Sequence, residues 1–151
     1  MIHVNPCWTE YAKSLTSLPK VSSTLDIWSL EELKSLRVDL ISHNPSFVFL
    51  WVGSHDNIEN GMELLKHWGF RRCEDITWIK TNKTKPGFAS EGEMLHRTTE
   101  HCLMGIKGTV RRAIDTHIIH ANVDTDLIIA EEPPLGNFSK PEEIYNIIEH
   151  F

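Results

Sequence analysis

The sequence reads Phe47-Val48-Phe49-Leu50-Trp51-Val52 at its most apolar point, and this run decides the fold class. Six consecutive apolar and aromatic residues are typical of a strand that is buried on both faces. Gly53 and Ser54 follow as a turn. Residues 58–68 then carry apolar side chains at helical spacing until Gly69 ends the helix. The centre of the chain therefore predicts a buried strand followed by a helix that packs on it.

The same alternation extends in both directions from this unit. We expect further strands at residues 1–5, 75–80, 102–106 and 126–130, helices at residues 30–36 and 141–151, and a polar loop at 81–97. The pattern predicts one α/β domain over residues 1–151, with an open sheet that helices cover. Ligands of such sheets bind at the carboxyl ends of the strands.

Composition narrows the class of protein. The chain has 151 residues, a net charge of −6 and three widely spaced cysteines, which is typical of a reduced globular domain. It has no apolar stretch of the ~20 residues that a membrane span needs, and we expect no metal site, since only His117 and His120 are closely spaced. The chain starts inside a strand and stops on a helix, so we expect it to be a piece of a longer protein.

Residues 5–8 read Asn-Pro-Cys-Trp directly after the first expected strand. Enzymes that methylate an exocyclic amine place Asp or Asn, then Pro, Pro and an aromatic residue at this point. The Asn5 amide oxygen and the Pro6 carbonyl would accept the two amine hydrogens, and Trp8 would stack on the base. Cys7 departs from that pattern by replacing the second proline. A strand followed by an ordinary turn explains the same residues, so both interpretations stay open.

Positive charge is clustered although the whole chain is acidic. The clusters are Lys66, Arg71 and Arg72; Lys80, Lys83 and Lys85; and Lys107, Arg111 and Arg112. If the fold brings them together, one face is basic and suits a nucleic acid. Three solvated loop ends are the alternative interpretation.

Two runs of thirteen residues resemble a known family. They are residues 71–83, Arg-Arg-Cys-Glu-Asp-Ile-Thr-Trp-Ile-Lys-Thr-Asn-Lys, and residues 100–112, Glu-His-Cys-Leu-Met-Gly-Ile-Lys-Gly-Thr-Val-Arg-Arg. Residues 120–124 and 140–145 extend the similarity, which covers nearly the whole chain. These runs resemble the MT-A70-like family, the mRNA N(6)-adenosine methyltransferases. The resemblance implies a Rossmann-like class I methyltransferase sheet with helices on both faces, C-terminally truncated at Phe151.

Within the family, residues 109–112 resemble the non-catalytic subunit more than the catalytic one. In that subunit the motif is Glu-Pro-Pro-Leu and does no chemistry. Residues 132–135 spell those letters here, but they follow the wrong strand, so we interpret them as a loop.

The resemblance also implies site residues. Those that match the RNA groove between the two subunits are Arg71, Arg72, Arg111 and Arg112, with Lys66 and Lys107 as weaker members. Guanidinium groups grip phosphates with paired hydrogen bonds, although Arg72 could instead pair with Glu74 or Asp75. Of the positions that contact the methyl donor, only Lys140 has an identifiable counterpart, and a lysine before a helix-opening proline is equally typical of a solvated helix cap.

Two hypotheses remain. In the first, the chain is an RNA-binding, non-catalytic scaffold subunit that pairs with a related catalytic subunit in the nucleus, through residues 56–68 and 81–97. S-adenosylmethionine then serves the complex, and no membrane is involved. In the second, the chain is itself an S-adenosylmethionine-dependent adenine N(6)-methyltransferase, acting on RNA or DNA through Asn5, Pro6, Cys7 and Trp8.

Overall fold

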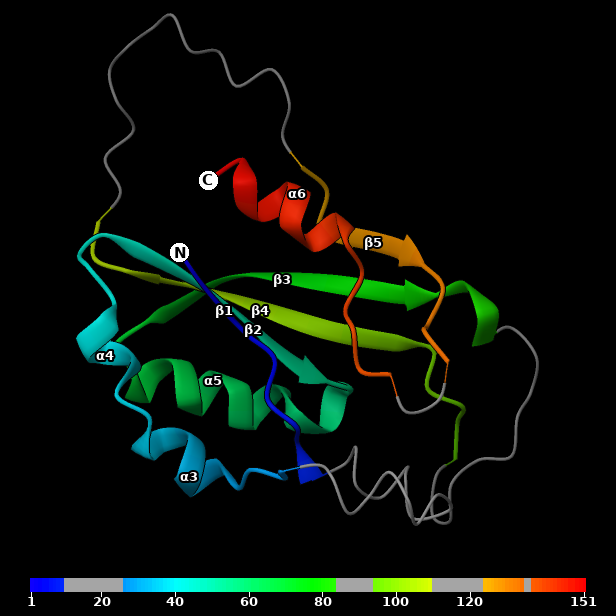
Figure 1. Ribbon diagram of the computed structural model, residues 1–151, viewed down its shortest axis with the longest axis horizontal. Coiled ribbons are helices and arrows are strands. Elements are labelled where there is room, and N and C mark those ends of the chain that lie inside the picture. The colour runs from blue at the N-terminus through cyan, green and yellow to red at the C-terminus, as the bar shows by residue number, and fades with distance from the viewer. Residues whose placement is uncertain (10–25, 84–93, 110–123, 135–136) are drawn as a thin grey trace, which may run out of the picture.

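Five strands form one mixed sheet in the computed structural model, which describes residues 1–9, 26–83, 94–109, 124–134 and 137–151 (Figure 1). The strands lie in the order β1-β2-β4-β3-β5. Their bounds are Ile2–Val4 (β1), Ser46–Gly53 (β2), Arg71–Lys80 (β3), Thr99–Lys107 (β4) and Leu127–Ala130 (β5).

Strand direction distinguishes the two ends of the sheet, which lie across the strands and are not its outer strands β1 and β5. β1 is parallel to β2 and β3 is parallel to β5, whereas β4 is antiparallel to both β2 and β3. Consequently β1, β2, β3 and β5 all run the same way. We call the edge where these four strands end the carboxyl edge, and the opposite edge the amino edge.

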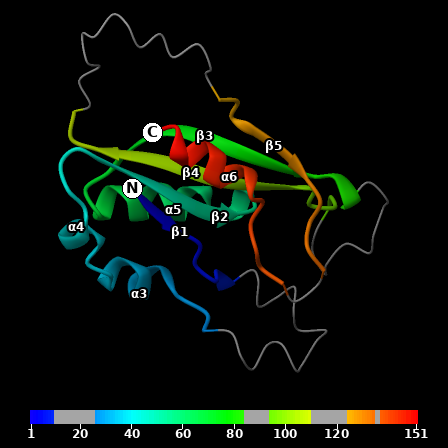
Figure 2. The same ribbon diagram turned by 45° about the horizontal axis from the view of Figure 1, so that its top comes forward.

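Helices cover both faces of the sheet, as the sequence predicts (Figure 2). The helices of the described residues are α3 (Leu30–Ser35), α4 (Val38–Ile41), α5 (Ile58–His67) and α6 (Glu143–Glu149), with single 3-10 turns at η1 (His55–Asn57) and η2 (Thr81–Lys83). Leu64 and Leu65 of α5 pack against Val48 and Leu50 on one face. On the other face, Ile144 and Ile147 of α6 pack against Phe49, Trp51 and Trp78.

A glycine lets α5 lie close to the sheet. A Cβ atom at Gly61 would overlap the Val52 side chain and come within 2.9 Å of Leu103 Cδ1. Both of those side chains are fully buried, so neither has open space to move into. The helical spacing of apolar residues predicts this helix but gives no sign that its contact face must contain a residue without a side chain.

The element boundaries correct several expectations. The strand expected at residues 75–80 begins at Arg71, and the one expected at 102–106 extends over Thr99–Lys107. Both extensions are polar segments held by pairing to neighbouring strands, which hydrophobic periodicity does not detect: Arg71 pairs with Ile106 and Arg72 with Gly105. The last helix begins at Glu143, not at Pro141, and α4 was not expected.

Candidate functional site

The Asn-Pro-Cys-Trp segment lies at the carboxyl edge, where β1 ends, as the sequence predicts. Asn5 is exposed, and its Nδ2 atom donates to the carbonyl oxygen of Phe138 at 3.3 Å. An amide has one acceptor oxygen where a carboxylate has two. Asn5 therefore offers a single acceptor to any ligand, and its nitrogen already ties the segment to the chain that leads into α6.

Trp8 is part of the core. Its side chain is 3% exposed and packs with the residues beneath α5, and its Nε1 atom donates to the carbonyl oxygen of Trp51 at 2.8 Å. The backbone N–H of Trp8 donates to the Pro6 carbonyl at 3.1 Å. The stacking role expected of Trp8 disagrees with this placement, since a base would reach the ring only if the indole left the core and broke a buried hydrogen bond.

Cys7 occupies a half-buried position between these two residues. Burial raises the pKa of the Cys7 thiol, and the nearby charge of Lys140 lowers it only in part. Because the thiolate is the reactive form of cysteine, this thiol is poorly suited to nucleophilic chemistry. Its backbone carbonyl accepts the N–H of Trp28 at 3.1 Å, so the residue ties this segment to the chain just before α3.

Lys140, the residue expected to contact the methyl donor, points into the protein. Its side chain is 4% exposed, and its Nζ atom lies 2.5 Å from Glu100 Oε2. The same ammonium group lies 5.2 Å from the centre of the Trp51 ring and 5.9 Å from that of Trp78. Burial lowers the pKa of Lys140, and attraction to Glu100 opposes this only in part. The ammonium is thus already neutralised and enclosed by the chain's own groups.

This pair belongs to a chain of alternating charges along the carboxyl edge. Glu100 binds Lys80 as well as Lys140, with Lys80 Nζ 2.7 Å from Glu100 Oε1. Lys80 also binds Glu132 at 2.6 Å, and Glu132 binds Lys83 at 2.6 Å. Sequence reasoning missed the network, although one signal was present: Lys80 shares a strand face with buried Ile76 and Trp78, where a lysine requires a partner.

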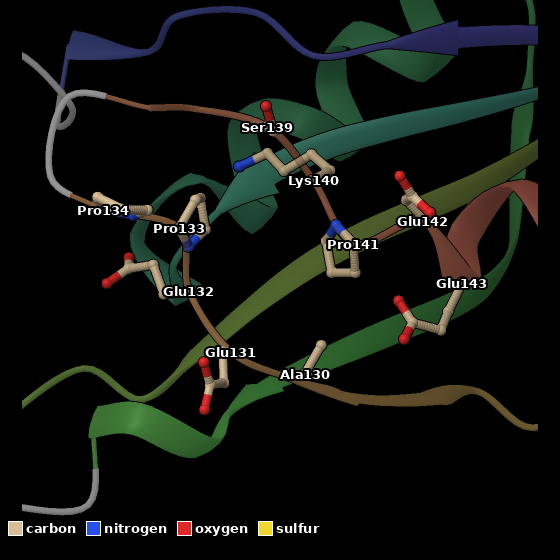
Figure 3. A pocket seen from close by; sticks show the side chains of 10 residues that line it. All are labelled: Ala130, Glu131, Glu132, Pro133, Pro134, Ser139, Lys140, Pro141, Glu142 and Glu143. Atoms are coloured by element: carbon tan, nitrogen blue, oxygen red, sulfur yellow. The ribbon is translucent and has the colours of Figure 1, made fainter.

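A shallow cavity of about 400 Å³ lies beside this network, between the end of β5 and the start of α6 (Figure 3). Its walls are Ala130, Glu131, Glu132, Pro133, Pro134, Ser139, Lys140, Pro141, Glu142 and Glu143. Residues 131–134 have no helix or strand, in agreement with the loop expected there, and Leu135 lies outside the described residues. The cavity's four carboxylates can attract the ammonium and sulfonium groups of S-adenosylmethionine, but its lysine is already paired with Glu100, so this lining offers the donor's carboxylate no uncommitted cation.

The expected nucleic-acid contacts lie at the opposite edge. Arg71 and Arg72 open β3, and Lys66 lies in the last turn of α5; all three are exposed, and none forms an ion pair with another described residue. The alternative pairing of Arg72 is therefore absent from the described part of the chain, where Asp75 contacts His101. Arg111 and Arg112 lie outside the described residues.

Lys107 has an internal role that the sequence did not reveal. Its Nζ atom donates to the Asp39 carbonyl at 3.1 Å and to Ser42 Oγ at 2.9 Å. These bonds satisfy the end of α4, as basic side chains often do at helix C-termini. The expected phosphate contact of Lys107 would have to compete with them.

A metal site and a membrane-spanning helix are both absent from the described residues. Over those ranges, no group of three or more His, Cys, Asp or Glu side chains is arranged to hold a metal ion, and His117 and His120 fall in a gap. In the same ranges, no helix combines the length and the apolar character needed to cross a bilayer.

Known proteins similar in sequence to this chain carry names from the family that residues 71–83 and 100–112 resemble. A protein of Drosophila melanogaster named N(6)-adenosine-methyltransferase non-catalytic subunit METTL14 is 50% identical over 155 residues, which cover 100% of this chain and 39% of that protein. The Danio rerio protein of the same name is 56% identical over 82% of this chain and 28% of its own length. The Arabidopsis thaliana non-catalytic subunit MTB is 52% identical over 90% of this chain and 18% of its own length.

This chain thus spans less than two fifths of each of these three relatives. The family model described as MT-A70 matches residues 1–151. The chain belongs to the MT-A70 family.

Proposed function

We propose that this chain is the RNA-binding, non-catalytic scaffold subunit of a nuclear N(6)-adenosine RNA methyltransferase heterodimer. The names of the relatives support the non-catalytic assignment. Its sheet is the Rossmann-like sheet of class I methyltransferases, and S-adenosylmethionine, the methyl donor of such enzymes, binds the catalytic partner. RNA is the favoured substrate, with DNA as the other outcome of a binding test.

The separation of the two candidate sites carries the proposal. Arg71 is the first residue of β3 and Lys80 is the last, and a strand of ten residues spans roughly 30 Å. The arginine pair is therefore a full strand length away from the carboxyl end of β3. Asn5 is nearer, because the register places Val4 level with Asp75; it lies three strands across the sheet from Arg71, roughly 20 Å away. We therefore place the reacting adenine of RNA held by these arginines in an active centre that another subunit supplies.

The second hypothesis, an active centre at Asn5, is less well supported. Of its four residues, Trp8 is buried, the Pro6 carbonyl already accepts a hydrogen bond, and the Asn5 amide nitrogen is bound to Phe138. The segment is thus engaged in holding the fold together.

A partly uncovered sheet face supports the pairing with a partner. Ile79, Leu127 and Ile129 lie on the α5 side of β3 and β5, and their side chains are 37%, 40% and 61% exposed. Parallel strands are normally covered on both faces. We place the catalytic partner on this face, next to the α5 and loop surface that the sequence suggested; residues 84–93 of that loop lie outside the described residues.

Two titrations test the function. In isothermal calorimetry, S-adenosylmethionine should bind the complex but not the chain alone; a tight one-to-one complex with the chain alone would reject the scaffold assignment. In RNA binding, R71A/R72A should weaken affinity for all sequences alike and reduce the salt slope by about one unit per lost contact. The matched control is Arg37→Ala, whose guanidinium is already bound to Asp39.

The partner face is tested separately. I129R should abolish the stable heterodimer in light scattering, while R71A/R72A should leave it intact. Unchanged pairing of I129R would move the interface to another surface.

A further inference from the structure

Two large aliphatic side chains stand in solvent at the amino edge. Leu40 and Ile41 of α4 are each 70% exposed, whereas Val38, one turn earlier, is 7% exposed and packs into the core. We call Leu40 and Ile41 the aliphatic pair. A single exposed leucine needs no explanation, but two neighbours at this exposure form a small apolar patch.

The aliphatic pair is displayed on a firmly held element. Lys107 Nζ binds both the Asp39 carbonyl and Ser42 Oγ, and Ser42 Oγ itself donates to the Asp39 carbonyl at 3.2 Å. Arg37 makes two hydrogen bonds of 2.8 Å to the Asp39 carboxylate. These contacts fix both ends of α4, so a partner would meet the patch with little ordering cost.

Positive charge borders the aliphatic pair. Arg72 pairs with Gly105, which faces Phe70 and Leu65 on the α5 side of the sheet, the side on which Val38 anchors α4, and both views place α4 beside the first residues of β3 (Figures 1 and 2). Arg72 and Lys66 are exposed here, whereas Arg71 shares the opposite face of the sheet with its pairing partner Ile106. The surface thus combines apolar and basic groups, although the whole chain carries a net charge of −6.

We propose that the aliphatic pair and its basic border dock an acidic segment of a partner protein that carries aliphatic side chains. The basic border selects acidic residues, and Leu40 and Ile41 bury the apolar ones. RNA fits less well, because an aliphatic side chain offers no aromatic ring on which a base can stack. This docking goes beyond the proposed RNA scaffold, and it would cover Arg72 and Lys66, so the segment and RNA would compete.

The test uses the full chain and a designed fluorescent helical peptide of about 16 residues, roughly four turns, with leucines on one face and glutamates elsewhere. Two control peptides replace all glutamates by lysine or all leucines by serine. A single-stranded RNA of similar charge is the second probe. The protein variants are L40S/I41S, R71A/R72A and the matched control I27S, which removes an exposed aliphatic side chain near the carboxyl edge; thermal melts check that each is folded.

The Glu–Leu peptide should bind saturably in the micromolar range, more weakly at high salt, and should displace the RNA. L40S/I41S should weaken binding of the peptide at least about tenfold and leave RNA affinity unchanged, while I27S changes neither. The proposal would be overturned if the Glu–Leu peptide failed to bind the protein. It would also be overturned if L40S/I41S bound that peptide as tightly as the wild type, or if the lysine or serine peptide bound the wild type equally well. A loss of RNA affinity in L40S/I41S would overturn it as well, because it would assign the pair to the RNA surface. The proposed RNA binding is refuted by a different result, an unchanged RNA affinity of R71A/R72A.

Discussion

Glu100→Gln should be among the most destabilising single substitutions at the carboxyl edge. The Glu100 side chain is 8% exposed and lies between the ammonium groups of Lys140 and Lys80, whose side chains are 4% and 9% exposed. Glutamine keeps the shape but removes the negative charge, which leaves two buried ammonium groups with one partner fewer. Removing one member of a buried ion pair typically costs about 3–5 kcal/mol, and we expect about 3 kcal/mol because Lys80 keeps Glu132.

The assay is the free energy of unfolding from urea titration, with a thermal melt beside it. For a chain of this size, about 3 kcal/mol corresponds to a fall in Tm of roughly 6–12 °C. The matched control is Glu31→Gln, which also loses a lysine partner but whose side chain is 81% exposed, so it should cost less than about 0.5 kcal/mol. Equal stability of the two variants would refute the argument that burial makes this network important.

Acid provides a second check on the same residue. Burial would raise the pKa of Glu100, but attraction to Lys140 and Lys80 outweighs it and holds the pKa below its ordinary value of 4.5. A lowered carboxyl pKa gives stability that is fully present above 4.5 and is lost as pH falls through the folded-state value. The difference between wild type and E100Q should therefore shrink below about pH 4.5.

Three further predictions follow from single contacts. Burial, together with the charge of Lys140, lowers the pKa of His3 below 6.5, and His3 Nε2 accepts a hydrogen bond from Trp51 Nε1 at 2.9 Å. The wild-type protein should therefore lose stability as pH falls below 6.5. Thermal melts should show that His3→Gln loses less stability over that range. Gly61→Ala should destabilise by about 1–2 kcal/mol in urea titration, because the clash with Val52 exceeds the gain in helix propensity; a more stable variant would contradict the close approach of α5. Trp8→Phe should cost about 1–3 kcal/mol through the unsatisfied Trp51 carbonyl, whereas Asn5→Ala should stay within about 0.5 kcal/mol in the same melts.

Local patterns predicted the elements that bury apolar side chains. The apolar run at β2, the helical spacing of Ile58, Leu65 and Trp68 in α5, and the Ser29–Glu32 pair that caps α3 all depend on residues close together in the chain. Met62 has the same spacing in α5 but is 46% exposed. The alternation of Ile76, Trp78 and Lys80, which the sequence also contains, places all three on one buried face of β3. These features follow from short-range geometry, so a single sequence contains them.

Long-range pairing could not be predicted in the same way. The polar start of β3 exists only because β4 lies beside it, and Lys80, Glu100 and Glu132 are brought together from three separate segments. The place of Lys107 beneath α4 depends on a contact with Asp39, 68 residues away in the chain. Charged contacts between residues far apart in the chain depend on the topology. The sequence therefore predicts the helices and strands better than it predicts the contacts of the candidate site.

The burial pattern within the Asn-Pro-Cys-Trp segment explains how a chain can resemble a catalytic motif through its fold alone. Pro6 and Trp8 are buried, whereas Asn5 is exposed and Cys7 is half-buried. Replacing the buried pair would leave a cavity and an unpaired Trp51 carbonyl, so the fold itself constrains those two positions. The exposed position contributes little to stability, and chemistry alone would constrain it. Pro6 and Trp8 are therefore evidence of a shared fold. Catalytic activity would instead depend on the groups around Asn5, whose Nδ2 atom already donates to the Phe138 carbonyl oxygen.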